Sequence, residues 1–391
     1  MGQPVVVSAV RTPIGKFGGA LKDMPAPRLG AVAVREAVAR AKLEAKDIEE
    51  CIMGNVITAG IGQNPARQAA LYGGLTDEVS ALTINKVCGS GLKAAMLASD
   101  SILAGKGKVI LAGGMESMSN APYLLDKARF GYKLFDSQLI DAMVRDGLWD
   151  VFNNFHMGNT GEIVAERNSI TREDADRFSV SSHQRAVRAI KSGGFANEIV
   201  NVEVRAGKAT TMFSVDEGPR EDSSMETLGK LKPVFKPTGV LTAGNSSSIN
   251  DGASAVVVMD SDMAKERGIV PLVKIVDYVT AGGKPELIME APIHAVKKLM
   301  ARTNTSVKDI DLFEHNEAFS TASIAVQRSL GIPDEKFNVN GGAVALGHPI
   351  GASGARVLTT LIYAMRSREA KRGIATLCLG GGNAVAMLIE R

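Results

Sequence analysis

Apolar and polar positions along the chain predict strands and helices in alternation. Short apolar runs at residues 4–9, 51–56 and 81–84 predict strands. Residues 28–41 place apolar side chains on one face at helical spacing, and good helix formers follow Cys88 at residues 92–98. Because helix and strand patterns alternate, the chain predicts an α/β fold in which helices cover a largely parallel sheet.

The later part of the chain repeats landmarks of the earlier part in the same order. Self-similarity of this kind indicates duplication, which we favour over a chance similarity in the order of helix and strand signals. We therefore expect two related α/β halves. The matched pairs are Ala26-Pro27 with Ala291-Pro292, Lys46-Asp47-Ile48-Glu49 with Lys308-Asp309-Ile310-Asp311, Gly89-Ser90-Gly91 with Ala352-Ser353-Gly354, and residues 109–114 with residues 375–381.

A segment without a counterpart separates the two halves. We expect residues 1–117 to begin the N-terminal half, residues 118–245 to form an inserted lid or loop domain that returns to that half, and residues 246–391 to form the C-terminal half. Within the insertion, Thr171-Arg172-Glu173-Asp174 is typical of a capping box and predicts a helix that runs to about residue 192. We interpret the insertion as a lid or an oligomerisation element.

Composition narrows the possible partners. Of the 391 residues, 45% are hydrophobic and 22% are charged, and the net charge of +3 is too small and too dispersed to favour nucleic acid. No apolar stretch is long enough to span a membrane, and the first residues lack the pattern of a signal peptide. The three cysteines form no C-x-x-C pair, which disfavours a zinc site or a disulfide framework and favours a reducing, cytoplasmic location.

Cys88 is the first candidate for chemistry. It lies between the strand that ends near Ile84 and the helix that begins near Leu92, and Gly89 and Gly91 follow it. A cysteine at a helix N-terminus faces unpaired N–H groups and the positive end of the helix dipole, and both favour the reactive thiolate. The alternative reading of this stretch alone is a small buried apolar residue in a glycine-rich turn.

Three further stretches place polar groups beside turns. Asn316 opens a helix, His348 lies in a glycine-rich loop, and Cys378 ends a strand before a run of glycines. If the two halves pack with pseudo-twofold symmetry, their equivalent turns would bring His348 close to Cys88, and a Cys–His pair makes a nucleophile. Each residue alone also fits a structural role, as a helix cap, a loop histidine or part of a tight turn.

Eight stretches of the chain act as a combined signature. They are Arg67-Gln68-Ala69-Ala70, Cys88-Gly89-Ser90-Gly91, Gly113-Gly114-Met115-Glu116-Ser117-Met118-Ser119, His156-Met157-Gly158, Thr242-Ala243-Gly244-Asn245, Asn316-Glu317-Ala318-Phe319, Gly347-His348-Pro349-Ile350-Gly351 and Cys378-Leu379-Gly380-Gly381-Gly382. Over essentially its whole length, the chain resembles the thiolase family, most closely its acetyl-CoA acetyltransferase members. The resemblance implies the thiolase fold, with duplicated α/β halves in a layered αβαβα core and an inserted loop domain.

The resemblance implies a role for each residue of the site. Cys88 would be the nucleophile that takes the acyl group from a coenzyme A thioester, and His348 would activate it and help to hold the thioester oxygen. Cys378 would move a proton at the α-carbon of the second thioester. Asn316 would position a water that forms one oxyanion hole with His348, and backbone N–H groups of Cys88 and Gly380 would form the other. The implied reaction condenses two acetyl-CoA to acetoacetyl-CoA and CoA through acyl-Cys88, or runs in reverse as thiolysis.

The resemblance also implies a coenzyme A pocket and an assembly. Coenzyme A thioesters would be the substrates, and neither a cofactor nor a metal is expected. The insertion resembles that of tetrameric members, which favours a homotetramer built as a dimer of dimers. Arg220 falls near a position that meets the nucleotide end of coenzyme A. The residues at matching pocket positions are His156, Met157, Ser247, Ala318 and Phe319.

The chain departs from the acetyl-specific pattern near the expected acyl pocket. His315 stands where a small apolar residue is usual, residues 288–292 replace a more glycine-rich stretch, and Ser248-Ile249 stands where Gly and Leu are common. These departures leave the acyl-chain length open, so a broader or longer-chain 3-ketoacyl-CoA thiolase is the alternative function. The stretch from Met115 to His156 is closer to short-chain biosynthetic members.

Two other readings fit less well. A decarboxylating ketoacyl synthase would normally have His or Asn in place of Cys378. A catalytically silent, coenzyme-A-binding homologue would not need the intact set of candidate catalytic residues. The remaining histidines outside the motifs, His183 and His294, fall on predicted helices and are expected to be surface or packing residues.

Overall fold

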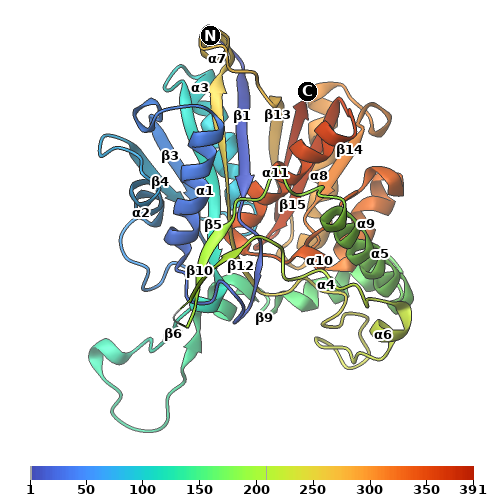
Figure 1. Ribbon diagram of the computed structural model, residues 1–391. Coiled ribbons are helices and arrows are strands. Elements are labelled where there is room, and N and C mark those ends of the chain that lie inside the picture. Colours follow the sequence, from blue (N-terminus) through green and yellow to red (C-terminus); the bar gives the residue numbers. More distant parts are fainter. Residues whose placement is uncertain (1, 208) are drawn as a thin grey trace.

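A ten-stranded sheet runs through the protein (Figure 1), whose computed structural model describes residues 2–207 and 209–391. Residues 1 and 208, which fall in the first two predicted segments, lie outside the described residues. The strand order is β14 (Leu312–His315), β15 (Arg372–Leu379), β16 (Asn383–Glu390), β13 (Val273–Gly282), β1 (Pro4–Arg11), β12 (Asn250–Asp260), β5 (Val109–Ser117), β3 (Glu50–Gly54) and β4 (Ser80–Ile84), with β2 (Gly15–Lys16) paired to β12.

The sheet consists of two groups of strands that meet at β1 and β13. β1 pairs with β12 along its length but with β13 only at Val5 and Val6. Within the first group, β12, β5 and β3 are consecutive neighbours, and in the second group β16, β15 and β14 repeat this arrangement. Each group therefore corresponds to one of the two halves expected from the sequence repeat.

The sheet is mixed, so the prediction of a largely parallel sheet is wrong. β3 pairs in parallel with β4 and β5, and β14 pairs in parallel with β15. β12 and β16 run antiparallel to their neighbours. For β16 the reason is local: residues 380–382 connect it to β15, and such a short connection permits a hairpin but not the crossover that parallel neighbours need.

Helices form three layers around the two groups of strands. α1 (Ala26–Arg40) and α2 (Pro65–Tyr72) pack on the first group, and α8 (Ala291–Thr303) packs on the second. α3 (Ser90–Leu103) and α11 (Ile350–Ser367) pack against each other, and α11 contacts strands of both groups. The layers follow the order helix, sheet, helix, sheet, helix, which confirms the predicted αβαβα core.

The two inner helices approach closely at the repeated turns. A Cβ added to Gly91 would lie 2.5 Å from the backbone nitrogen of Ala355, and one added to Gly354 would lie 2.3 Å from that of Leu92. Only glycine permits backbones to approach this closely. The equivalent turns of the two halves therefore meet in the centre of the molecule, as the repeat predicted.

Other paired landmarks also adopt matching structures. α1 and α8 both begin with Ala-Pro, where the ring of proline suits the first helical turn. The short 3₁₀ helices η1 (Ala45–Asp47) and η6 (Val307–Asp309) each carry a capping box and lead into β3 and β14. The duplication is therefore visible at the level of single turns.

The inserted segment lies across one end of the core (Figure 1). The predicted capping box at Thr171 and Asp174 is present and begins α5. Both α4 and α5 pack against α9 of the second half, whereas the connection between β6 and β7 extends away from the core. The elements concerned are β6 (Tyr123–Leu124), β7 (Ile140–Asp141), β8 (Trp149–Asp150), β9 (Phe155–His156), α4 (Met157–Arg167), α5 (Arg172–Lys191), β10 (Val202–Ala206), β11 (Ala209–Phe213), α6 (Met225–Gly229) and α9 (Ser320–Leu330).

β12 follows the insertion in sequence but lies in the first group of strands. It pairs with β1 on one side and with β5 on the other. The division at residue 246 assigns this strand to the C-terminal half, because no landmark in the sequence marks it as the return to the first sheet. We propose instead that the N-terminal half extends through β12, and that α7 (Ser261–Glu266) leads into the second half.

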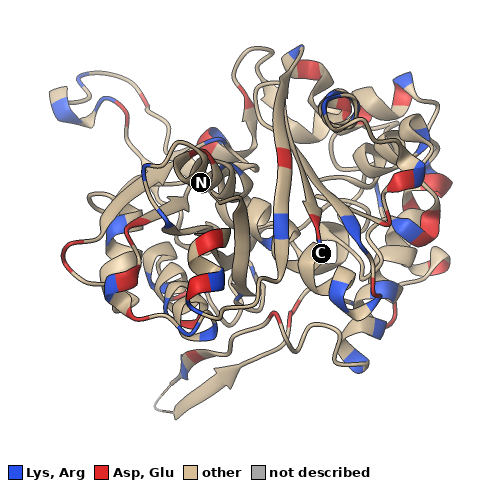
Figure 2. Ribbon diagram, turned by 90° about the horizontal axis from the view of Figure 1, so that it is seen from above, with Lys and Arg blue, Asp and Glu red and all other residues tan. Residues whose placement is uncertain are grey.

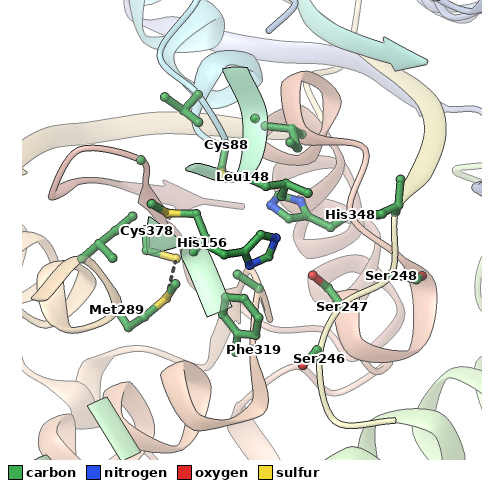
Figure 3. Close-up of a pocket in the computed structure, with 18 of the residues that line it drawn as sticks. Cys88, Leu148, His156, Ser246, Ser247, Ser248, Met289, Phe319, His348 and Cys378 are labelled. Carbon is green, nitrogen blue, oxygen red and sulfur yellow. Dashed lines mark hydrogen bonds between the residues drawn. The ribbon is translucent and has the colours of Figure 1, made fainter. Parts of the chain in front are cut away.

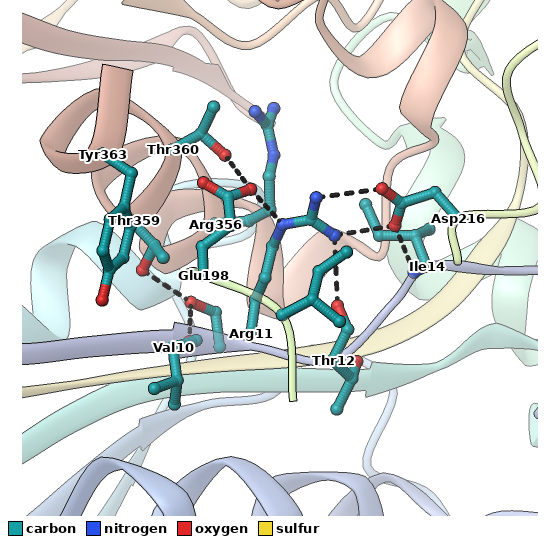
Figure 4. Close-up of polar contacts among 12 residues, drawn as sticks. Val10, Arg11, Thr12, Ile14, Glu198, Asp216, Arg356, Thr359, Thr360 and Tyr363 are labelled. Atoms are coloured by element: carbon teal, nitrogen blue, oxygen red, sulfur yellow. Dashed lines mark hydrogen bonds and ion pairs between the residues drawn. The ribbon is translucent and has the colours of Figure 1, made fainter. Parts of the chain in front are cut away.

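A buried ion cluster ties the insertion to the core (Figure 4). Arg11, at the end of β1, is fully buried, and its Nε donates to Glu198 at 2.6 Å. Its Nη1 and Nη2 donate to the two carboxylate oxygens of Asp216 at 2.7 and 2.9 Å. Glu198 also accepts a hydrogen bond from Thr360 of α11 at 3.1 Å. Because an unpaired buried charge is costly, this cluster fixes the insertion relative to both β1 and α11.

The surface mixes charges of both signs. Figure 2 shows Lys and Arg interspersed with Asp and Glu on the outer helices. Within the described part of the chain, every helix is too short or too polar to cross a membrane.

Candidate active site

The turn before α3 holds Cys88 in a strained but well-supported conformation. Ser90 Oγ donates to the carbonyl of Val87 at 2.7 Å. Val87 has a φ of +47°, which a β-branched residue rarely adopts. A Cβ on Gly89 would lie 2.1 Å from Leu379, so this position requires glycine. The backbone therefore fixes the direction of the Cys88 side chain.

Cys88 carries its proton at neutral pH. Its side chain keeps partial solvent access, but burial raises the pKa of its thiol to about 12. The backbone N–H groups of Gly380 and of Cys88 itself lower this pKa, but burial outweighs them. The N–H groups at the turn favour the thiolate, as expected from the sequence, but they do not overcome burial, so a base has to remove the proton.

Cys88, His348 and Cys378 line one cavity of about 260 Å³ (Figure 3). Cys88 comes from the first half, and the other two come from the second half. Most of the remaining wall is apolar, which keeps the dielectric low and strengthens electrostatic interactions inside. The apolar side chains are those of Val87, Met118, Leu148, Met157, Phe235, Ile249, Ile288, Met289, Ala318, Phe319 and Ile350.

His348 is a neutral imidazole in this cavity. Its backbone N–H donates to Asn250 Oδ1 at 2.9 Å, which anchors the loop before α11. Burial, with a smaller contribution from the positive charge of Arg356, lowers the pKa of its side chain to about 3. A neutral imidazole can accept a proton, so His348 is equipped to act as the base that Cys88 needs.

Ser353 determines which nitrogen of His348 is the acceptor. Its Oγ donates to the carbonyl of Pro349 at 2.9 Å and lies 2.6 Å from His348 Nδ1. A hydroxyl has one hydrogen, so towards Nδ1 the serine can only accept. Nδ1 therefore carries the hydrogen of the neutral ring, and Nε2 is left with a free lone pair.

Asn316 lies beside this lone pair. It is fully buried, and its Nδ2 is 3.4 Å from His348 Nε2. Its backbone N–H donates to Thr376 at 3.1 Å, which ties it to the neighbouring strand β15. Among the residues that the structure describes, its Oδ1 has no hydrogen-bond partner. Asn316 thus offers one oriented donor and one unoccupied acceptor next to the imidazole.

Cys378 occupies a different environment from Cys88. It ends β15, is 1% exposed, and lies within 3.8 Å of the Met289 sulfur. Burial and the nearby Cys88 raise the pKa of its thiol well above the ordinary range. The following hairpin needs two glycines with φ of +81°, Gly381 and Gly382. A thiol in this setting becomes a strong base once it loses its proton.

Comparison with known proteins assigns the chain to a family. The model for the thiolase N-terminal domain matches residues 4–262, and that for the thiolase C-terminal domain matches residues 269–391. The chain belongs to the thiolase family. It is 49% identical to an acetyl-CoA acetyltransferase of Cupriavidus necator over the whole of both chains. It is 51% identical to one of Escherichia coli, over 99% of this chain and 98% of the relative.

The fold agrees with a solved thiolase structure. The crystal structure of the Bacillus anthracis acetyl-CoA acetyltransferase is similar to this chain with a TM-score of 0.98 and 41% sequence identity. The match covers 100% of this chain and 99% of the other. The predicted thiolase fold is therefore confirmed.

Five of the six residues proposed for the coenzyme A pocket line the same cavity as Cys88, His348 and Cys378. Phe319 lies edge-on to Phe235, and Phe235 in turn stacks on the ring of His156 with centroids 5.0 Å apart. His156 Nδ1 accepts the backbone N–H of Gly158 at 3.0 Å and so caps α4. Burial lowers the pKa of His156. The five lining residues are His156, Met157, Ser247, Ala318 and Phe319.

Four other polar residues lie outside the cavity wall. Arg220 is exposed, and its backbone N–H donates to His183 Nδ1 at 3.1 Å. His183 is therefore a buried packing residue, whereas His294 is exposed. His315 is fully buried, lies 3.0 Å from Ser323 and stacks on Phe337. Over residues 2–207 and 209–391, no group of three or more acidic, His or Cys side chains could hold a metal ion.

Sequence reasoning missed two residues that organise the thiolase site. Ser353 appeared only as part of a repeated turn, although its place one helical turn after Pro349 could have suggested the contact. Glu116 is fully buried and accepts the backbone N–H groups of Val56, Ile57 and Gly351 at 2.9–3.2 Å. Burial raises its pKa to about 7. It joins β5 to the start of α11, next to the His348 loop.

Proposed function

We propose that the protein is an acetyl-CoA C-acetyltransferase, an acyltransferase that condenses two acetyl-CoA to acetoacetyl-CoA and CoA and also catalyses the reverse thiolysis. The observation that carries the proposal is the meeting of two thiols and one neutral imidazole in a single apolar cavity. The names of the relatives from Cupriavidus necator and Escherichia coli support the substrate assignment.

The first half-reaction transfers an acetyl group to Cys88. His348 Nε2 takes the thiol proton as the sulfur bonds to the thioester carbonyl carbon. The carbonyl oxygen gains negative charge, and the N–H groups of Cys88 and Gly380 are its proposed donors. The carbon–sulfur bond to coenzyme A then breaks, and Cys378 gives its proton to the departing sulfur. This leaves acetyl-Cys88, a protonated His348 and a Cys378 thiolate.

The second half-reaction forms the carbon–carbon bond. The Cys378 thiolate takes a proton from the α-carbon of a second acetyl-CoA, whose oxygen is stabilised by protonated His348 and by a water held at Asn316. The enolate carbon attacks the acetyl carbon on Cys88, and the Cys88 sulfur leaves and regains its proton from His348. All protons return to their starting groups. The raised pKa of Cys378 suits this step, because the α-proton is only weakly acidic.

The proposed mechanism uses protein side chains, backbone N–H groups, a water and coenzyme A thioesters, without a cofactor. We place the enzyme in the cytoplasm, because its three cysteines are free in the structure and two of them act as thiols. We also propose a homotetramer, a dimer of dimers. Apolar side chains on the extended connection between β6 and β7 support this assembly, because such exposure is unusual unless a partner covers it. They include Phe130, Leu134 and Phe135, which are 88%, 82% and 96% exposed.

The test is the reaction with acetyl-CoA and with acetoacetyl-CoA. Incubation with acetyl-CoA followed by peptide mass spectrometry should place an acetyl label of about 42 daltons on Cys88. Acetoacetyl-CoA should give a higher kcat/KM than 3-ketoacyl-CoA substrates of six or more carbons. A label on Cys378 or Cys51 with Cys88 free would contradict the mechanism. A preference for the longer substrates would instead support the 3-ketoacyl-CoA thiolase alternative.

A further inference from the structure

A second and larger groove, of about 1200 Å³, lies away from the active-site cavity. It forms where α1, the insertion and the second half meet, and its wall includes residues from the segments 192–197, 270–272 and 363–368. Of the described residues, none lines both the groove and the active-site cavity. The helix α11 begins next to His348 and ends at the groove, and its 18 residues span about 27 Å. The groove is therefore separate from the active-site cavity.

Positive charge gathers along this groove. Four arginines line it, and the described residues of its wall include neither Asp nor Glu. Arg40 ends α1, Arg366 and Arg368 lie at the end of α11, and Arg391 follows β16. Arg40 forms an ion pair with Glu36, whereas the other three arginines form no ion pair with a side chain in the described part of the chain. A groove lined by one sign of charge attracts ions of the opposite sign, so an anion fits it.

Uncharged oxygens hold two of the guanidinium groups in place without neutralising them. Arg391 Nη1 donates to the carbonyl of Arg366 at 3.3 Å, and Arg368 Nη2 donates to Asn340 Oδ1 at 3.2 Å. Cations at the end of α11 also interact favourably with the helix dipole, which accounts for their place there but leaves their charge in the groove. A guanidinium has five N–H donors, so Arg366, Arg368 and Arg391 keep most of theirs for a ligand.

We propose that this groove binds the polyphosphate group of a small molecule, which is either free polyphosphate or the phosphate chain of a nucleotide. Guanidinium groups donate pairs of N–H bonds to phosphate oxygens, and several of them in one groove match a ligand with two or more phosphates. The groove exceeds the volume of a typical small-molecule site, which is about 300–1,000 Å³. Val270, Leu272 and the half-buried Tyr363 also line it and offer apolar contacts to a nucleoside.

Isothermal titration calorimetry with inorganic tripolyphosphate, at about 150 mM salt, tests the site. The wild-type protein should bind it with a Kd below about 100 µM. The double variant Arg366→Gln and Arg368→Gln should bind about tenfold or more weakly, because it loses charged hydrogen-bond donors. The control, Lys106→Gln with Lys108→Gln, removes the same charge from exposed positions in the loop after α3, outside the groove. Its Kd should stay within about twofold of the wild-type value. Arg391→Gln is the substitute if the double arginine variant does not fold.

The same titration in Arg220→Gln separates the groove from the expected nucleotide end of the coenzyme A pocket. Binding that is lost in Arg220→Gln but kept in the double arginine variant would overturn the groove as the site. No binding to the wild-type protein, or an equal loss in the arginine and lysine variants, would also overturn it.

A loss confined to the arginine variant supports the site, and ATP then identifies the source of the phosphates. Measured in Arg220→Gln, an affinity for ATP above that for tripolyphosphate identifies a nucleotide, whereas equal affinities identify free polyphosphate. Both results support the groove as a polyphosphate site. Binding is measured without the acetyltransferase reaction, so failure of the proposed function would leave these outcomes unchanged.

Discussion

Replacing Ser353 with alanine should slow acylation of Cys88 by changing the protonation of His348. The Ser353 hydroxyl is fully buried and holds the hydrogen of Nδ1 at a 2.6 Å contact. Without it, that N–H group is left without an acceptor, at a cost of about 1–3 kcal/mol. The ring then favours the tautomer with its hydrogen on Nε2, which cannot accept the Cys88 proton. The same free-energy cost corresponds to roughly 5- to 150-fold in rate.

The assay is the burst of CoA released when enzyme is mixed with acetyl-CoA. Ser99→Ala is a matched control, because Ser99 is also fully buried and donates to the carbonyl four residues earlier, at 2.8 Å from Ala95, but it does not contact His348. Nitrogen NMR of the protein labelled at its five histidines reports the tautomer directly. If Ser353→Ala acylates within about twofold of Ser99→Ala, or keeps the hydrogen on Nδ1, the orienting role is refuted.

Three further predictions follow from the same geometry. Cys378→Ala should still accept an acetyl group on Cys88, since the CoA thiolate can take its proton from solvent. Its rate of acetoacetyl-CoA formation should fall by about 10³-fold or more. Condensation near the wild-type rate would show that another base acts. Between about pH 6 and 9, neither His348 nor Cys88 should titrate in the kcat/KM profile for acylation, because the pKa of His348 is lowered to about 3 and that of Cys88 is raised to about 12. A titration in that window that is absent in His348→Asn would contradict this protonation state. The double substitution Leu134→Asp and Phe135→Asp should reduce the assembly mass measured by light scattering from that of a tetramer to that of a dimer. Lys127→Asp on the same connection should leave the tetramer intact. An unchanged mass of the double variant would show that the connection between β6 and β7 has no role in assembly.

The sequence predicted the layers of the fold better than the direction of the strands. The repeat implied that the turns at residues 89–91 and 352–354 were equivalent, and the structure shows that the two helices approach closely at Gly91 and Gly354. Strand direction depends on the connections, and the short link between β15 and β16 was read as a functional turn rather than as a hairpin. β12 gave no signal either, because it returns to the first sheet only after the long insertion.

For the candidate site, the sequence likewise predicted where the residues lie better than it predicted their ionisation and contacts. The motifs placed Cys88, His348, Cys378 and Asn316 in one region, and the structure brings them together. The ionisation of Cys88 could not be predicted from its place before a helix, because the outcome depends on how much protein surrounds the sulfur. The contact between Ser353 and His348 likewise depends on side-chain directions at the start of α11.

Duplication explains why one site contains two cysteines with different tasks. Cys88 precedes the inner helix α3 of the first half, and the equivalent turn of the second half leads from His348 into α11. The repeated turn therefore carries the proposed nucleophile just before one inner helix and the proposed base just before the other, at positions three residues apart in the repeat. Cys378 comes from a third place, the end of β15, which is equivalent to the end of β5 that carries Glu116. Because Glu116 uses its oxygens to hold backbone N–H groups near α11, the first half supplies support where the second half supplies a base. In the proposed mechanism each half thus contributes what the other lacks, and both halves are needed for the two half-reactions.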